Sequence, residues 1–182
     1  MANWYKDQLT NKNFLSPIGF VFLLQRAQKT SFLCQKATIP NMSLGEVPIP
    51  TAGMVPIPIE GNMVYGDLEV EFIVDEDLRN YMEVHNWMRA LVTPQNYGER
   101  TDWERKYQFH ASDDPRYSDA TLQVLNNNNL ANFDVLFKSV FPVALGALPF
   151  DVTQSDNQYL TATATFKYML FEVRNVSSQT RR

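Results

Sequence analysis

The sequence has few of the side chains that enzymes use for covalent or acid–base chemistry. Its one cysteine, Cys34, excludes an internal disulfide and a zinc site built from several thiolates. Of its two histidines, His85 lies on the apolar side of a predicted helix, where we interpret it as packed, and His110 lies in a polar stretch, where we interpret it as solvated. No GxSxG, P-loop or GxGxxG motif occurs. We therefore expect no enzyme, no catalytic residue and no cofactor.

Two acidic clusters remain as candidates for a metal or acid–base site. Residues 75–77 (DED) precede the predicted helix, where Asp75 fits an N-cap and negative charge is favoured by the helix dipole. Asp113 and Asp114 stand before Pro115 and form a turn signal. Because capping and turn formation account for both clusters, we predict no metal site.

The sequence also lacks the features that are typical of membrane-spanning, secreted and nucleic-acid-binding proteins. The longest apolar run, residues 18–24, is interrupted by Gly19 and is too short to span a membrane. The first fourteen residues have no apolar core and do not resemble a signal peptide, which predicts an intracellular product. The net charge of -4 argues against tight, sequence-independent binding of nucleic acid, because such binding relies on a basic surface.

What the sequence does contain is a strand that runs directly into a helix. Residues 68–74 alternate with a period of two, which indicates a half-buried strand with Glu69, Glu71 and Ile73 on the face away from its apolar side chains. From Leu78 onward the apolar residues recur at three- and four-residue steps, which predicts a helix at about residues 76–92. Pro94 ends that helix.

Alternating segments elsewhere predict about seven strands in total. Residues 20–28 and 32–38 are predicted to pair as a hairpin, and further strands are predicted at 120–126, 134–141 and 158–173. With one flanking helix, these predict an all-β fold, a two-sheet antiparallel β-sandwich or barrel, in a single domain over 1–182. Within this domain, but outside the sandwich itself, we expect an N-terminal arm at 1–15, a projecting proline-rich loop at 41–63, a polar insertion without regular structure at 95–118, and a polar tail at 175–182.

The proline-rich segment repeats one motif, since residues 47–50 (VPIP) return as residues 55–58. Prolines two residues apart in an extended chain remove hydrogen-bond donors from the same edge, so the segment pairs on one side only, as an edge strand or projecting arm. A monomer gains nothing by exposing such apolar side chains. We therefore predict a subunit or ring interface formed by Pro48, Ile49, Pro50, Thr51, Gly53, Met54, Pro56, Ile57 and Pro58.

Several stretches resemble the tail tube proteins of T4-type contractile-tailed bacteriophages. They are FLSPIGF at 14–20, CQKATIP at 34–40, LGE at 44–46, FIVDEDL at 72–78, Asn80-Tyr81, HNW at 85–87 and Phe141-Pro142. The similarity covers about residues 14–173 and is strongest up to residue 91. Tube and tube-initiator proteins share this pattern, and the sequence does not separate them.

The resemblance implies a structural virion protein of the tail, assembled in the host cytoplasm. It implies a β-sandwich with a flanking helix, six copies in a ring, and rings stacked into a hollow tube through which DNA passes without specific binding. The tail sheath and the baseplate are the implied partners, and no membrane is involved. Glu69 and Glu71 then face the lumen, or else the helix, a neighbouring subunit or solvent.

Two other readings stay open. One is a different ring of the same machinery, namely a tube-initiator or baseplate-hub protein, a tail terminator, or a tube protein like that of type VI secretion. The other is a small β-barrel module that binds nucleic acid or a ligand as a monomer, against which the acidic balance argues.

Overall fold

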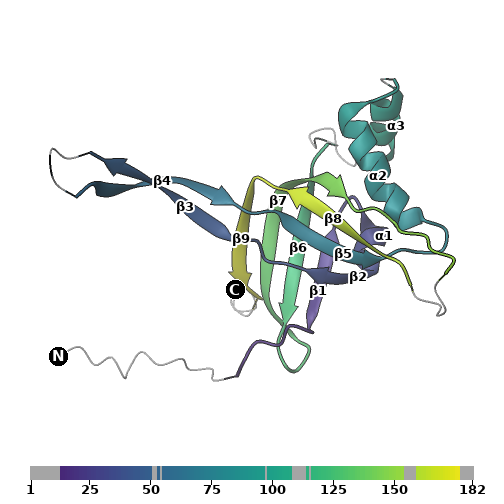
Figure 1. Ribbon diagram of the computed structural model, residues 1–182. Coiled ribbons are helices and arrows are strands. Elements are labelled where there is room, and N and C mark those ends of the chain that lie inside the picture. Colours follow the sequence, from purple (N-terminus) through teal and green to yellow (C-terminus); the bar gives the residue numbers. More distant parts are fainter. Residues whose placement is uncertain are drawn as a thin grey trace.

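The computed structural model describes residues 13–50, 53, 55–96, 98–107, 114, 116–153 and 159–176. Over these residues the chain forms nine strands and three helices (Figure 1). In chain order they are β1 (Phe20–Leu24), α1 (Gln28–Phe32), β2 (Cys34–Ala37), β3 (Met42–Ile49), β4 (Ile57–Tyr65), β5 (Leu68–Ile73), α2 (Arg79–Val92), α3 (Gly98–Tyr107), β6 (Ser118–Leu125), β7 (Ala131–Leu145), β8 (Thr161–Lys167) and β9 (Leu170–Asn175).

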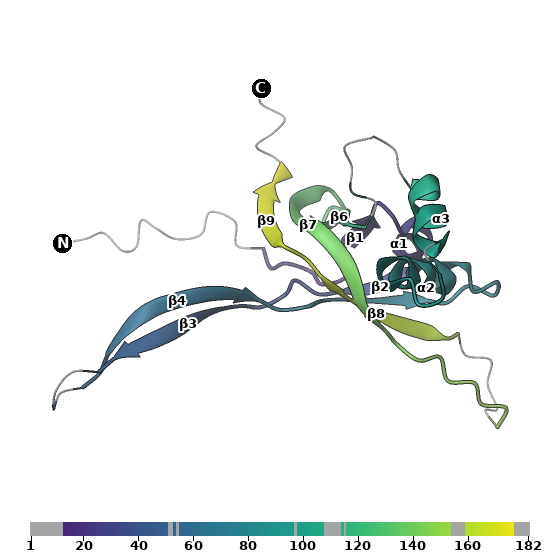
Figure 2. The ribbon, with the colours of Figure 1, turned by 90° about the horizontal axis from the view of Figure 1, so that it is seen from above.

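Seven of the strands form one folded antiparallel sheet. Its order is β1-β6-β7-β8-β5-β2, with β9 also paired to β7, while β3 and β4 form a separate two-stranded sheet. Strands β1, β6, β7 and β9 make one layer, and β8, β5 and β2 cross it as a second layer (Figures 1 and 2). Almost fully buried side chains fill the space between the layers, among them Phe22, Leu122, Phe137, Phe72 and Phe166. The predicted all-β, two-sheet antiparallel fold is confirmed.

Strand β7 joins the two layers. Its first half pairs with β6 and β9, and its second half pairs with β8. The change of partner falls between Lys138, which lies opposite β9, and Phe141, which lies opposite β8. Between them Ser139 has a positive φ of 56°, uncommon for a residue other than glycine, and its N–H donates to the Asp119 carboxylate at 3.2 Å. The sheet turns its corner at this residue.

The prediction of one long strand over 158–173 is wrong. Strand β8 ends at Lys167 and β9 begins at Leu170, and the Met169 N–H donates to the Lys138 carbonyl at 3.0 Å where the chain turns between them. Both strands pair with β7, so the alternation of side chains continues around the corner. The period of two therefore predicts that the chain is extended over these residues. It does not predict the position at which the chain passes from one layer to the other.

The predicted hairpin between residues 20–28 and 32–38 is also wrong. Strand β1 pairs with β6 and β2 pairs with β5, so the two segments belong to different layers. The expected turn between them is the start of helix α1. The Leu24 N–H donates to the Ser31 hydroxyl of α1 at 2.8 Å, and the buried Thr30 hydroxyl donates to the Asn80 carbonyl at 3.2 Å. These bonds fix α1 against β1 and α2.

The predicted helix near residues 76–92 is confirmed as α2. It begins at Arg79 because Asp75, the expected N-cap, accepts the Asn80 N–H at 3.1 Å from outside the helix, and Leu78 has a left-handed φ of 56°. Helix α3 corrects the expectation of an unstructured insertion at 95–118. Among its residues 98–106, whose burial is described, Trp103 is the buried one.

Helix α2 covers the inner side of strand β5. The Trp87 ring lies 6.2 Å from the Phe166 ring, and Phe166 is directly opposite Leu68, so all three share one face. Trp87 also stacks on Trp103 of α3 at 6.1 Å. The face of β5 that carries Glu69 and Glu71 is therefore not the face on which α2 packs.

We expect Trp87→Ala to lower the free energy of unfolding by about 3–5 kcal/mol, as for other buried aromatic residues. Trp87 is fully buried, it contacts two aromatic rings, and its indole N–H donates to the Arg116 carbonyl at 2.9 Å. Urea unfolding followed by circular dichroism measures the change. Met82→Ala on the exposed side of the same helix should change stability by less than about 0.5 kcal/mol. Equal losses in the two variants would show that α2 is not anchored by Trp87.

Candidate assembly surfaces

Strands β3 and β4 form a ribbon that projects away from the sandwich (Figures 1 and 2). Every residue of β3 is exposed, and so is every residue of β4 except Gly61 and Tyr65. Seven of the predicted interface residues lie in the outer part of this ribbon: Pro48, Ile49, Pro50, Gly53, Pro56, Ile57 and Pro58. The other two, Thr51 and Met54, lie outside the described residues.

The two edges of the ribbon are short of hydrogen-bond donors. Pro48 lies directly opposite Pro58, and the neighbouring pairs Val47–Ile59 and Ile49–Ile57 flank it. Opposite residues in an antiparallel pair either exchange N–H···O bonds or point these groups outward. Because proline has no N–H, Pro48 and Pro58 take an outward-pointing position and offer only carbonyl oxygens there. A further strand cannot add to either edge with a regular ladder at this point.

The two faces of the ribbon differ in character. Directly opposite residues share a face and alternate residues change face. One face, the apolar face, carries Val47, Ile49, Ile57 and Ile59, and the opposite face carries the Pro48–Pro58 and Glu46–Glu60 pairs. Like charges directly opposite each other, as in Glu46–Glu60, destabilise a ribbon. All of these side chains are exposed in the single chain.

A bulge fixes which residues face each other along the ribbon. The register shifts between Leu44 and Glu46, so that Gly61 and Asn62 of β4 both oppose Gly45. A Cβ on Gly61 would lie 2.9 Å from the Gly45 carbonyl oxygen, and glycine is therefore needed at this close approach. Without the extra residue, Pro58 and Glu60 would not meet Pro48 and Glu46.

An aromatic cluster anchors the base of the ribbon to the sandwich. Tyr65, the last residue of β4, lies 5.6 Å from the Phe171 ring and 6.0 Å from the Tyr168 ring. Burial raises the pKa of Tyr168 to about 12. The Gly66 N–H donates to the Asn41 carbonyl at 2.9 Å and closes the ribbon. These contacts set the direction in which the ribbon leaves the body.

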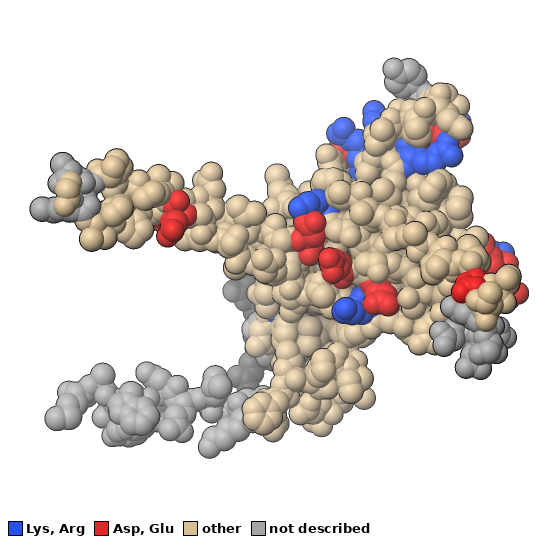
Figure 3. Space-filling model, viewed as in Figure 1, with Lys and Arg blue, Asp and Glu red and all other residues tan. Residues whose placement is uncertain are grey.

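The outer face of β5 carries a mixture of charges. Glu69 is exposed and Glu71 is half-buried, and they lie opposite Thr165 and Thr163 of β8. On the other side Lys36 of β2 is opposite Glu71. Figure 3 shows acidic and basic side chains together across the middle of this side of the molecule. In the single chain this face is open, and its role stays a prediction.

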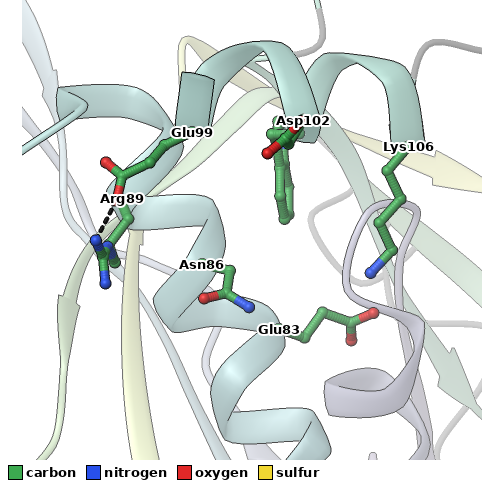
Figure 4. Close-up of a pocket in the computed structure, with 7 residues that line it drawn as sticks. Glu83, Asn86, Arg89, Glu99, Asp102 and Lys106 are labelled. Atoms are coloured by element: carbon green, nitrogen blue, oxygen red, sulfur yellow. Dashed lines mark hydrogen bonds and ion pairs between the residues drawn. The ribbon is translucent and has the colours of Figure 1, made fainter. Parts of the chain in front are cut away.

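A cavity of about 340 Å³ lies between α2 and α3. Figure 4 shows Glu83 and Lys106 pointing into it from opposite sides, and Arg89 paired with Glu99 at one end. Burial is the main cause that raises the pKa of Glu83, although the Lys29 N–H donates to its carboxylate at 3.1 Å. The cavity could not be predicted from the sequence, because residues 95–118 were expected to lack regular structure and α3 forms one of its walls.

The described part of the chain also lacks the clustered ligands that a metal site requires. That part has no group of three or more His, Cys, Asp and Glu side chains placed to hold a metal ion. Burial raises the pKa of the Cys34 thiol to about 11, which keeps it protonated and unreactive at neutral pH. His110 and Asp113 lie outside the described residues. Of the helices described, none has the length and apolar character to cross a membrane.

Solved structures with a similar fold come from contractile injection systems. The chain is 12% identical to a chain of the anti-feeding prophage tube-terminating cap, with a TM-score of 0.62, and the match covers 97% of this chain and 100% of that one. It is 13% identical to a chain of the sheath-tube complex of an extracellular contractile injection system in the extended state, with a TM-score of 0.59 and coverage of 91% and 94%. A chain of the six-fold symmetrised anti-feeding prophage baseplate is 14% identical, with a TM-score of 0.58 and coverage of 86% and 91%. At these identities the likeness concerns the fold.

The family described as phage tail tube protein matches residues 9–174, which is most of the chain. The protein therefore belongs to the phage tail tube protein family. Its role is structural, as a component of a tube, and the family places it in the tail of a virion. A comparison with curated protein sequences gave no match.

If Pro48 and Pro58 keep further strands from pairing with the edges of the ribbon, replacing them should allow such pairing. We expect Pro48→Val with Pro58→Val to add an outward N–H on each edge of the ribbon and so to promote irregular edge-to-edge aggregation. Light scattering and thioflavin T fluorescence measure it over time. The matched control is Ile49→Val with Ile57→Val, which changes side chains of the same ribbon but adds no donor. Scattering equal to that of the control would mean that the prolines do not protect the edges.

Proposed function

We propose that six copies of this chain form a ring and that the rings stack into the inner tail tube of a contractile-tailed bacteriophage. The tube would be the channel through which DNA is ejected. The observation that carries the proposal is the projecting ribbon, whose apolar face leaves Val47, Ile49, Ile57 and Ile59 exposed in the single chain. Family membership supports the tube, and the fold shared with tube, cap and baseplate components supports an assembly of rings.

The remaining parts of the proposal follow from this role. The chain is not an enzyme, and its partners are further copies of itself, the tail sheath and the baseplate. It assembles in the host cytoplasm before it becomes part of the virion tail. A tube terminator is the second candidate, because the likeness to a tube-terminating cap is as good as that to a chain of a sheath-tube complex.

We expect Ile49→Asp with Ile57→Asp to abolish assembly and leave the fold unchanged. The side chains are 43% and 57% exposed, so the single chain loses little packing, whereas an interface that buries them would bury two carboxylates. Negative-stain microscopy and light scattering detect rings and tubes, and circular dichroism checks the fold. Rings or tubes formed by the double variant would show that the ribbon is only a surface feature. A wild-type chain that stays monomeric at every concentration would contradict the tube proposal itself.

We further propose that Glu69 and Glu71 face the lumen. DNA must pass without sticking, and an acidic wall favours this because like charges repel. The support is that α2 packs on the opposite face of β5, which leaves the face with the two glutamates uncovered by the helix. A solvated or subunit-facing position is the alternative.

If the glutamates line the channel, Glu69→Lys with Glu71→Lys should leave assembly intact and make the tubes retain DNA at low salt. Retention should fall as salt rises, because the attraction is electrostatic. Co-sedimentation of tubes with labelled DNA over a salt series measures it. Glu69→Gln with Glu71→Gln is the control, since it removes charge without reversing it. Reversed-charge tubes that bind no more DNA than the parent would rule out a lumenal position.

A further inference from the structure

A groove along strand β1 and helix α1 has a predominantly apolar lining. It has a volume of about 470 Å³ and is lined by 21–25, Gln28, Ser31 and Phe32. None of these residues is charged. Val21, Leu23 and Phe32 are 41%, 54% and 88% exposed, which is a large apolar surface for a single chain to leave open.

The groove also contains an open sheet edge. β1 is the end strand of its layer and pairs with β6. The Gln25 N–H donates to the Asp119 carbonyl and the Leu125 N–H donates to the Gly19 carbonyl, so the odd-numbered positions along β1 bond to β6. The even-numbered positions then point their N–H and C=O groups outward. The Leu24 N–H donates to the Ser31 hydroxyl at 2.8 Å, which leaves the N–H of Phe22, a residue that lines the groove, on the open edge. The Phe20 N–H lies further along the same edge.

The outer part of the ribbon is complementary to this groove in its hydrogen-bonding groups and in its apolar side chains. Its edges at Pro48 and Pro58 present carbonyl oxygens, which can accept hydrogen bonds from the N–H groups on the β1 edge. Its apolar face carries four branched side chains on two adjacent strands, Val47, Ile49, Ile57 and Ile59. Strand β3 has eight residues and spans about 26 Å, long enough to reach across a neighbouring molecule. The ribbon of one chain points away from its own β1 and α1, the elements that form the groove (Figures 1 and 2).

We propose that the apolar face of the ribbon of one copy docks into the β1–α1 groove of another copy. Two other surfaces are less suited to the apolar face of the ribbon, because both carry charged side chains. The cavity between α2 and α3 is lined by five charged side chains, and the outer face of β5 carries Lys36, Glu69 and Glu71. The inference rests on the proposed self-assembly and adds to it the surface that receives the ribbon.

Cross-linking between two single-cysteine chains tests the contact. Both chains carry Cys34→Ser, and one also carries Ile49→Cys and the other Leu23→Cys, with different affinity tags. After mixing, assembly and mild oxidation, we expect a disulfide between the two differently tagged chains, because a disulfide requires Cα atoms within about 7 Å. The control replaces Leu23→Cys by Val143→Cys, an apolar position on β7 that is 46% exposed. The groove pair should give at least a fivefold higher yield than the control pair, and an equal or lower yield would overturn the proposal.

A second measurement separates this inference from the tube proposal. Leu23→Asp should abolish assembly and Val143→Asp should not, with circular dichroism unchanged in both. Wild-type chains that assemble while Leu23→Asp also assembles would overturn the groove contact and leave the tube proposal standing. Wild-type chains that never assemble would overturn both.

Discussion

The pairing of one strand, β7, with partners in both layers is the constraint on which the rest of the structure depends. Because β8 and β9 both pair with β7, the chain must change layer between them, opposite Ser139. That corner brings Tyr168 and Phe171 to the point where β4 ends at Tyr65. The direction of the ribbon is therefore a consequence of how the sheet folds, although the ribbon itself contributes nothing to the core.

The sequence could predict those elements whose own side-chain periodicity identifies them, wherever their partners lie along the chain. Strand β5 and helix α2 were predictable because their periods differ and because each buries one continuous face. Helix α3 was not, since its buried Trp103 packs on Trp87 of another element and its sequence shows no apolar period of 3.6 residues. The partners of β1 and β2 could not be read from local patterns either. Phe20 lies opposite Val124, about a hundred residues away, and a turn-like segment between two strands suggested a hairpin instead.

Of the candidate surfaces, the donor-poor edge of the ribbon could be predicted from the sequence, whereas the pairing within the ribbon and the groove beside β1 could not. The proline repeat alone predicts an edge without donors, because the positions of prolines in an extended chain decide which N–H groups are missing. That Pro48 meets Pro58 and Glu46 meets Glu60 depends on the bulge at Gly61, which spacing along the chain does not reveal. The groove beside β1 could not be predicted, since part of its wall is helix α1, a segment whose first half was interpreted as a turn. The interface role of the ribbon residues stays a prediction.

The proposed contact joins two different surfaces, the ribbon of one copy and the β1–α1 groove of the next. Such a contact is heterologous, so each copy that joins offers a fresh ribbon or a fresh groove, and growth continues until a ring closes or the stack is ended. A subunit with the same sandwich but with one of the two surfaces altered would bind the end of a tube and stop it. Chains of similar fold occur both in a sheath-tube complex and in a tube-terminating cap. This agrees with tube and cap subunits that share one fold and differ at such a surface. The difference between a chain that polymerises and one that caps would then lie in a few side chains, such as Leu23 and Phe32 in the groove or Ile49 and Ile57 on the ribbon, and not in the fold.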